Sequence, residues 1–180
     1  MYIDVKNDKN NLEIGHEKES KTNIPQKFKW NELTVWDCPG FIDTEKKRDI
    51  LNVFCMKKLF TLHKKVKFIL VIDFSTLDLD RGGKFIEVME QFLDCFSSDI
   101  EQLKKSIILI INKCDPGIDK DGIENDIEEI LDRNKSIDDN IKDFIEYIKN
   151  NLIIFHKPSK VGKLDTNEIH NNLLKINNNL

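Results

Sequence analysis

The chain has 180 residues, 33% of them charged and 39% hydrophobic, with a formal net charge of −4 at pH 7. This composition is typical of one globular domain and excludes collagen-like, mucin-like and disulfide-scaffold proteins, while the acidic balance argues against binding nucleic acid. No apolar run reaches the roughly 18 residues of a membrane span. The four cysteines are isolated from one another, which favours a reducing, intracellular and cytoplasmic location over a disulfide framework or a zinc site.

Strands are predicted to alternate with helices along most of the chain, after a first segment, residues 1–29, that we expect to be mainly loop. The continuous apolar run at 68–72 is typical of a strand buried on both sides. In chain order we expect a strand at 32–36, a helix at about 45–63, a strand at 68–72, a helix following Gly82 and Gly83, a strand at 107–111, helices at about 121–133 and 138–150, a strand at 152–155 and a helix at 167–176.

This alternation predicts a single α/β domain over residues 1–180, with a mostly parallel sheet and right-handed crossovers. Polar clusters follow three of the expected strands, after Trp36, Ile111 and Phe155. In open parallel sheets ligands bind at the carboxyl ends of the strands. The clusters are therefore the candidate binding residues.

The most informative cluster is Asn-Lys-Cys-Asp at residues 112–115. A carboxylate at the mouth of a strand, here Asp115, can accept hydrogen bonds from both the ring nitrogen and the exocyclic amine of guanine, and adenine cannot donate both. Asn112 would brace the loop and the stem of Lys113 would lie along the base. The alternative is an ordinary turn rich in Asn and Asp.

A second cluster, Asp-Cys-Pro-Gly at residues 37–40, follows the strand expected at 32–36. Asp37 could hold Mg²⁺, which prefers few carboxylates together with phosphate oxygens. Gly40 lacks a side chain, so its N–H could approach a terminal phosphate closely. The alternative is a plain Pro-Gly turn.

Taken in order, the two clusters resemble the D-x-x-G and N-K-x-D motifs of P-loop GTPases. Residues 14–22 are similar to the I-G-x-x-x-x-S-x-T stretch of GTPases of the immune-associated (avirulence-induced-gene) type and of septin-like families. The resemblance implies a three-layer P-loop fold with helices on both faces of the sheet, and GTP and Mg²⁺ as ligands. It implies that Thr22 joins Asp37 at the metal and that Ser159 and Lys160 touch guanine through backbone N–H groups.

The chain departs from that family in two places. It contains no G-x-x-x-x-G-K-[S/T] loop, because the Gly-Lys pairs at 83–84 and 162–163 are followed by Phe85 and Leu164. The N-terminal strand–loop–helix unit is therefore expected to be missing, and a truncated gene model is the simplest hypothesis. Phe41 stands where small GTPases carry a water-orienting glutamine. No catalytic residue is assigned, although His16 is a candidate.

The leading expectation is a GTP-binding domain that acts as a GTPase switch in its full-length form, with a second copy or another protein as partner on the switch face. One alternative is a degenerate, nucleotide-free interaction module with the shape of a G domain. Another is a truncated product without activity. An ATP-using P-loop protein is disfavoured by Asp115.

Overall fold

The structure, a computed structural model, describes residues 25–40, 54, 57–59, 66–96, 100–157 and 167–175. The chain divides into two compact units, over residues 2–64 and 65–180, and each is described by itself. The single domain expected from the sequence stays a prediction. None of the described helices is long and apolar enough to cross a membrane.

In the first unit, strands β1 (Gln26–Trp30) and β2 (Leu33–Asp37) form an antiparallel hairpin. Asn31 in the turn has φ +52°, a left-handed conformation that asparagine tolerates. β2 confirms the strand expected at 32–36. The loop expected for residues 1–29 is wrong at β1, where Phe28 and Trp30 alternate with lysines in the two-residue period of a strand.

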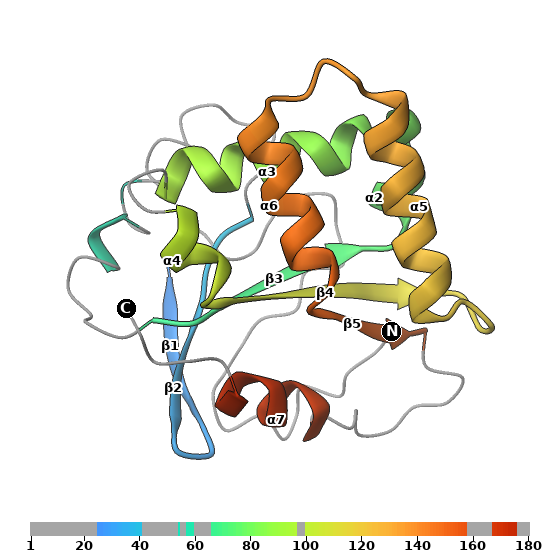
Figure 1. The fold of residues 1–180 in the computed structure, drawn as a ribbon. Coiled ribbons are helices and arrows are strands. Elements are labelled where there is room, and N and C mark those ends of the chain that lie inside the picture. Colours follow the sequence, from blue (N-terminus) through green and yellow to red (C-terminus); the bar gives the residue numbers. More distant parts are fainter. Residues whose placement is uncertain are drawn as a thin grey trace. The chain divides into compact units, whose positions relative to one another are not determined.

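In the second unit, three parallel strands form one sheet in the order β3 (Phe68–Asp73), β4 (Ile107–Cys114) and β5 (Leu152–His156) (Figure 1). The mixed α/β class and the parallel sheet expected from the sequence are confirmed to this extent. The register pairs Asp73 with Asn112 and Cys114 with His156, so the carboxyl ends of all three strands meet at one edge.

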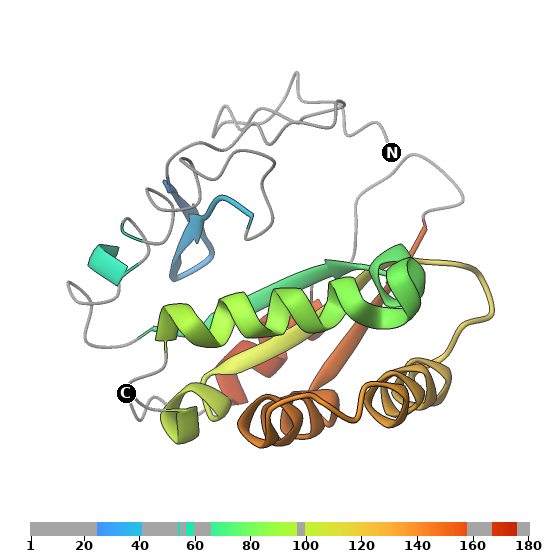
Figure 2. The same cartoon turned by 90° about the horizontal axis from the view of Figure 1, so that it is seen from above.

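Four helices confirm the longer helical predictions of this unit, and α3 runs alongside β3 and β4 (Figure 2). The short elements α2, η2 and α4 were not predicted. Of the helix expected at about 45–63, only residues 54 and 57–59 lie in the described part, and they are helical. The helices are α2 (Ser75–Asp78), η2 (Leu79–Gly82), α3 (Gly83–Phe96), α4 (Ile100–Lys104), α5 (Lys120–Arg133), α6 (Asp139–Lys149) and α7 (Asn167–Lys175).

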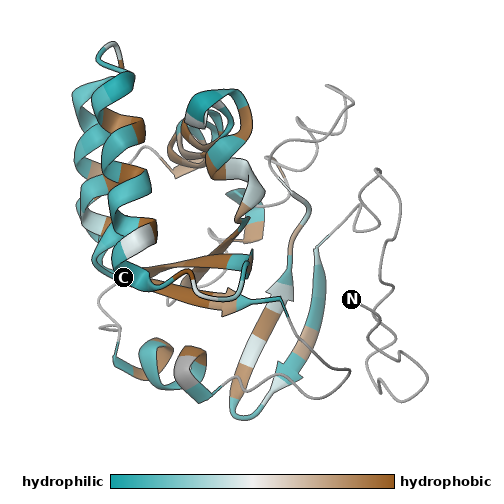
Figure 3. Ribbon diagram, turned by 90° about the vertical axis from the view of Figure 1, so that its right-hand side faces the viewer, coloured by the Kyte–Doolittle hydropathy of each residue, from teal (hydrophilic) through white to brown (hydrophobic). Residues whose placement is uncertain are grey.

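Helices α3, α5 and α6 lie on one side of this sheet and α7 on the other (Figure 3). The first five residues of β4 are buried, which explains their unbroken apolar run. On the α3 side, the rings of Phe92 and Phe144 stack with centroids 5.9 Å apart, and Phe68 and Phe96 complete the aromatic cluster. Such pairs add about 0.5–1.5 kcal/mol each beyond the area they bury, so this cluster stabilises the packing of α3 and α6 at the start of β3.

Candidate functional site

The polar cluster expected after β4 is built into the end of that strand. Asn112, Lys113 and Cys114 belong to β4, and the pairing with β5 shifts register between Ile111 and Cys114, as at a β-bulge. Lys113 has φ +58°, and its N–H donates to Asn112 Oδ1 at 2.9 Å. The Asn112 side chain thus stabilises a backbone conformation that lysine otherwise avoids, which is the bracing role expected of it.

Both neighbouring strands fasten this bulge. The Phe74 N–H, directly after β3, donates to the Asn112 carbonyl at 2.8 Å. On the other side, the Lys157 N–H donates to the Cys114 carbonyl, also at 2.8 Å. The polar side chains of the bulge therefore project from a backbone that is hydrogen-bonded to a neighbouring strand on each side.

Asp115 is the first residue beyond β4, and its carboxylate meets a lysine from the end of β5. Lys157 Nζ lies 2.5 Å from Asp115 Oδ1, and the two side chains are 53% and 56% exposed. The hydrogen bond to Asp115 raises the pKa of Lys157 above its usual value. The pair joins the ends of two adjacent strands across the candidate site.

A second ion pair crosses from β4 to β3. Lys113 Nζ lies 2.5 Å from Asp73 Oδ2, and Asp73 Oδ1 accepts hydrogen bonds from the Ser75 N–H at 3.1 Å and hydroxyl at 2.9 Å. Partial burial raises the pKa of Asp73, but the hydrogen bonds from Lys113 and Ser75 outweigh it and lower the pKa below its usual value. Asp73 is thus an ionised anchor for the Lys113 side chain.

The loop after Asp115 is tied down as well. The Ile118 N–H donates to the Asp115 carbonyl at 3.2 Å, and Gly117 takes φ +94° to make this turn. His156 Nε2 lies 2.7 Å from the Ile118 carbonyl and must carry the proton, because a carbonyl oxygen only accepts. The loop closes with Asp119, whose side chain accepts from the Gly122 N–H and caps α5.

Asp37 and Gly40 belong to the other unit, at and just beyond the end of β2. Next to Asp37, burial first and the neighbouring carboxylate second raise the pKa of the Cys38 thiol to about 11. The remaining predicted site residues, Thr22, Ser159 and Lys160, lie outside the described residues, as does His16.

Within the described part of the chain, no three His, Cys, Asp or Glu side chains gather as a metal site. A Mg²⁺ ion bound with a nucleotide takes much of its shell from phosphate oxygens and water, so one or two protein ligands suffice. The assignment of Asp37 and Thr22 to Mg²⁺ stays a prediction.

Sequence reasoning missed two members of the site, Asp73 and Lys157. The signal for Asp73 was available, because it ends the apolar run at 68–72 and carboxyl ends of parallel strands share an edge. Lys157 was passed over in favour of its successors, Ser159 and Lys160, since its pairing depends on the register of β5 against the bulge.

Comparison with models of protein families, with curated protein sequences and with solved structures found no match for this chain. The resemblance to P-loop GTPases therefore rests on the sequence motifs. What the described site offers chemically is an exposed carboxylate, Asp115, at the edge of a parallel sheet, paired with Lys157, and beside it a second ion pair between Lys113 and Asp73.

Proposed function

We propose that the chain binds a guanine nucleotide at the carboxyl edge of the sheet β3–β4–β5, with Asp115 accepting hydrogen bonds from the base. The observation that carries the proposal is the bulge at Asn112–Asp115, which presents the carboxylate from a backbone fastened on both sides. A preformed acceptor recognises a donor pair without the cost of ordering a loop.

The ion pair between Asp115 and Lys157 is the principal competitor of the base. Because both side chains are more than half exposed, solvent screens the pair and it contributes little to stability. Two hydrogen bonds from guanine to an ionised carboxylate contribute about 1.5–3 kcal/mol each. The base therefore displaces Lys157 at little cost.

Lys113 contributes shape and position to the proposed site. Its ammonium is held by Asp73, and the left-handed backbone at Lys113 sets the direction in which the aliphatic stem leaves β4. Such a stem offers an apolar surface to the face of a base while its charge stays in water. Asp73 would then act as a positioning residue for Lys113.

The finer parts of the proposal follow the resemblance to P-loop GTPases. The fold would be the three-layer P-loop type, Gly40 would sense the terminal phosphate, and Asp37 with Thr22 would hold Mg²⁺. Ser159 and Lys160 would add backbone contacts to the base. In its full-length form the protein would act as a GTPase switch, with a second copy or another protein docking on the switch face.

A nucleotide-free interaction module with this fold is the second candidate. It is favoured by one observation: Asp115 pairs with Lys157, and Lys113 pairs with Asp73. In such a module the two ion pairs would serve only to join the strand ends. Removing either pair would then lower the stability of the fold without changing the affinity for any nucleotide.

Competition among nucleotides separates the two candidates. We expect GTP to bind with a Kd on the order of 0.1–1 mM, measured by saturation-transfer NMR with Mg²⁺, and ATP to bind at least tenfold more weakly. Because the sequence has no G-x-x-x-x-G-K-[S/T] loop to grip the phosphates, the base contact is read most directly with the monophosphates, and GMP should bind at least tenfold more tightly than AMP. Binding of neither nucleotide favours the nucleotide-free module, and equal binding of GTP and ATP contradicts base recognition by Asp115.

The base contact itself is tested by Asp115→Asn. An asparagine replaces one acceptor by an N–H donor, which opposes the exocyclic amine of guanine and matches the 2-oxo group of xanthine. We expect the variant to prefer XTP over GTP. Asp94→Asn, an exposed carboxylate on α3, is the matched control and should keep the wild-type preference. An unchanged preference in Asp115→Asn would remove Asp115 from the site.

A further inference from the structure

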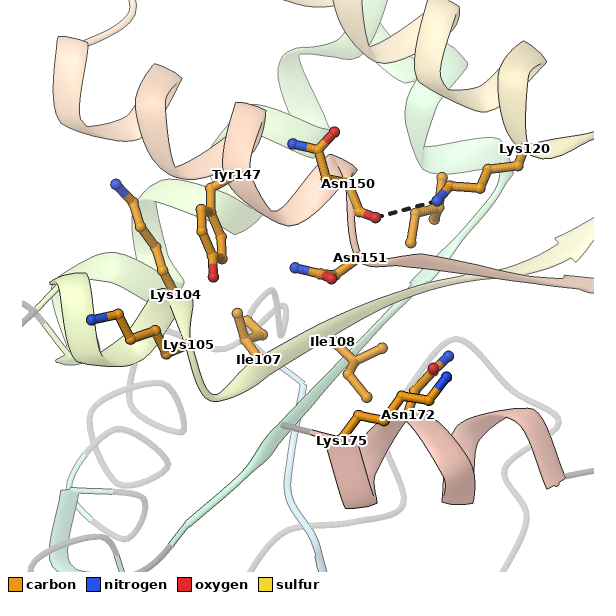
Figure 4. Close-up of a pocket in the computed structure, with 11 residues that line it drawn as sticks. Lys104, Lys105, Ile107, Ile108, Lys120, Tyr147, Asn150, Asn151, Asn172 and Lys175 are labelled. Carbon is orange, nitrogen blue, oxygen red and sulfur yellow. Dashed lines mark hydrogen bonds between the residues drawn. The ribbon is translucent and has the colours of Figure 1, made fainter. Parts of the chain in front are cut away.

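A second concave site lies at the amino ends of β4 and β5, away from the edge that carries Asp115 (Figure 4). β5 begins opposite Leu109, so Ile107 and Ile108 extend beyond the start of β5. These two residues line a cavity of about 440 Å³. That volume falls within the range of small-molecule sites.

Lysines dominate the charge of this cavity. Lys104, Lys105, Lys120 and Lys175 line it from the end of α4, the following turn, the start of α5 and the end of α7, and we call it the lysine pocket. None of its described lining residues is acidic. In a protein with a net charge of −4, four lysines around one cavity make its local charge differ from that of the whole chain.

Two of the four lysines already have partners. Lys104 pairs with Glu101 at 2.8 Å and with Asp143, and its aliphatic stem is buried. Lys120 donates to the Asn150 carbonyl at 3.2 Å and lies 3.4 Å from Glu124. These contacts fix the walls of the pocket and leave less charge from this pair for a ligand.

Lys105 and Lys175 differ from them. Both are exposed, and neither forms an ion pair with any residue that the structure describes. They approach the lysine pocket from separate elements, the α4–β4 turn and the end of α7. Two ammonium groups without a carboxylate partner in the described part of the chain are suited to an anion that carries more than one charge.

The inner surface adds polar groups and an apolar floor. Figure 4 shows the Tyr147 hydroxyl directed toward Ile107, and the Asn151 side chain beside it at the start of β5. A hydroxyl and a primary amide both donate hydrogen bonds, which phosphate oxygens accept. The ammonium of Lys104 lies over the Tyr147 ring, 5.8 Å from the ring centroid, in a cation–π contact.

We propose that the lysine pocket binds a small anion with two or more phosphate groups. Its volume exceeds what a single phosphate fills, the charged side chains among its described lining residues are cationic, and its neutral polar groups can donate hydrogen bonds. Because the lysine pocket lies at the amino ends of the strands, it is separate from the proposed guanine site and does not depend on it.

The probe is inorganic pyrophosphate, titrated into the full chain at constant ionic strength and followed by ¹⁵N–¹H NMR. Shifts should concentrate at residues 104–108, 147–152 and 172–175. The double variant Lys105→Ala/Lys175→Ala should weaken binding about tenfold, the effect of two exposed, screened charges acting together. Both side chains are exposed, so the variant is expected to fold.

The matched control is Lys135→Ala/Lys142→Ala, which removes the same charge from exposed lysines outside the lysine pocket. It should leave the pyrophosphate Kd within twofold of the wild type. Equal weakening by both double variants, or shifts spread over other surfaces, would show an adventitious ion only and overturn the proposal.

Two further measurements test whether the ligand must be a phosphate and whether the two proposed sites are independent. Citrate, a polyanion without phosphate, should bind at least fivefold more weakly than pyrophosphate; equal binding would refute the phosphate assignment. Asp115→Asn should leave the pyrophosphate Kd unchanged. If guanine nucleotides fail to bind while pyrophosphate shifts the lysine pocket, the guanine proposal fails alone, and the reverse result defeats only the lysine pocket.

Discussion

Lys157 Nζ lies 2.5 Å from Asp115 Oδ1, so the end of β5 supplies a cation to the carboxylate at the end of β4. The pair closes the edge of the sheet between the two strands. A base that binds Asp115 must take the place of this ammonium, and the strength of the pair therefore sets part of the nucleotide affinity.

Removing the competing cation should strengthen guanine binding. In Lys157→Met the Asp115 carboxylate is free of its ammonium partner, and we expect the affinity for GTP to rise up to about fivefold, the limit set by an exposed ion pair. Competition NMR measures the change, and Lys135→Met, an exposed lysine elsewhere, is the control. A loss of affinity would mean that Lys157 contacts the nucleotide.

Asn112→Ala should disturb the bulge. The variant removes the acceptor for the Lys113 N–H, which lies 2.9 Å away, and leaves the left-handed residue unsupported. We expect a loss of about 1 kcal/mol in the free energy of unfolding and weaker GTP binding. Asn140→Ala, on the exposed surface of α6, should change neither quantity. Wild-type GTP affinity in Asn112→Ala would contradict the bracing role.

Asp73→Asn should act in a pH-dependent way. The pKa of Asp73 is lowered in the folded protein, so its contribution to stability is present above the unfolded value of about 3.9 and is lost as pH falls through the folded value. We expect the variant to unfold more easily in urea at pH 7, by about 1 kcal/mol or less, and the difference from the wild type to shrink as the pH falls through the lowered pKa. Asp94→Asn should show no such difference, and a pH-independent deficit would rule out the ion pair with Lys113 as the cause.

Gly82→Ala should be costly for two separable reasons. Gly82 has φ +87°, and a Cβ there would clash with the side chain of Ile130. Gly117, with φ +94°, has open space around the same position. We expect about 1 kcal/mol of destabilisation in Gly117→Ala from the backbone alone and about 3 kcal/mol in Gly82→Ala, where a core clash is added. Equal values in urea unfolding would contradict a close packing of η2 against α5.

The sequence was sufficient to predict those helices and strands whose burial produces a regular pattern of apolar residues. Strands β3 and β4 appeared as apolar runs, and α3, α5, α6 and α7 as amphipathic patterns, because a single face or both faces of each pack against neighbours. The short elements α2 and α4 have too few turns to show a period. β1 was hidden by its lysines, although Phe28 and Trp30 alternate with them.

For the site, sequence placed Asn112, Lys113 and Asp115 near the end of a strand but not within a bulge of it. The strand was expected to stop at Ile111, since polar side chains usually mark a loop; here they continue β4 because the main chain keeps its ladder partners. The partners Asp73 and Lys157 come from other strands, and only the register of the sheet pairs them with β4.

The bulge at the end of β4 also affects how the sheet opens locally in the folded protein. Its carbonyls at Asn112 and Cys114 each receive an amide from a different neighbouring strand, so neither can separate from the sheet unless that neighbour moves too. The amides of Phe74 and Lys157 should consequently exchange with deuterium slowly, as amides of a cooperative core do. The polar tip of this sheet would then open with its hydrophobic interior, and a molecule that docks at the tip would slow the opening of the whole unit.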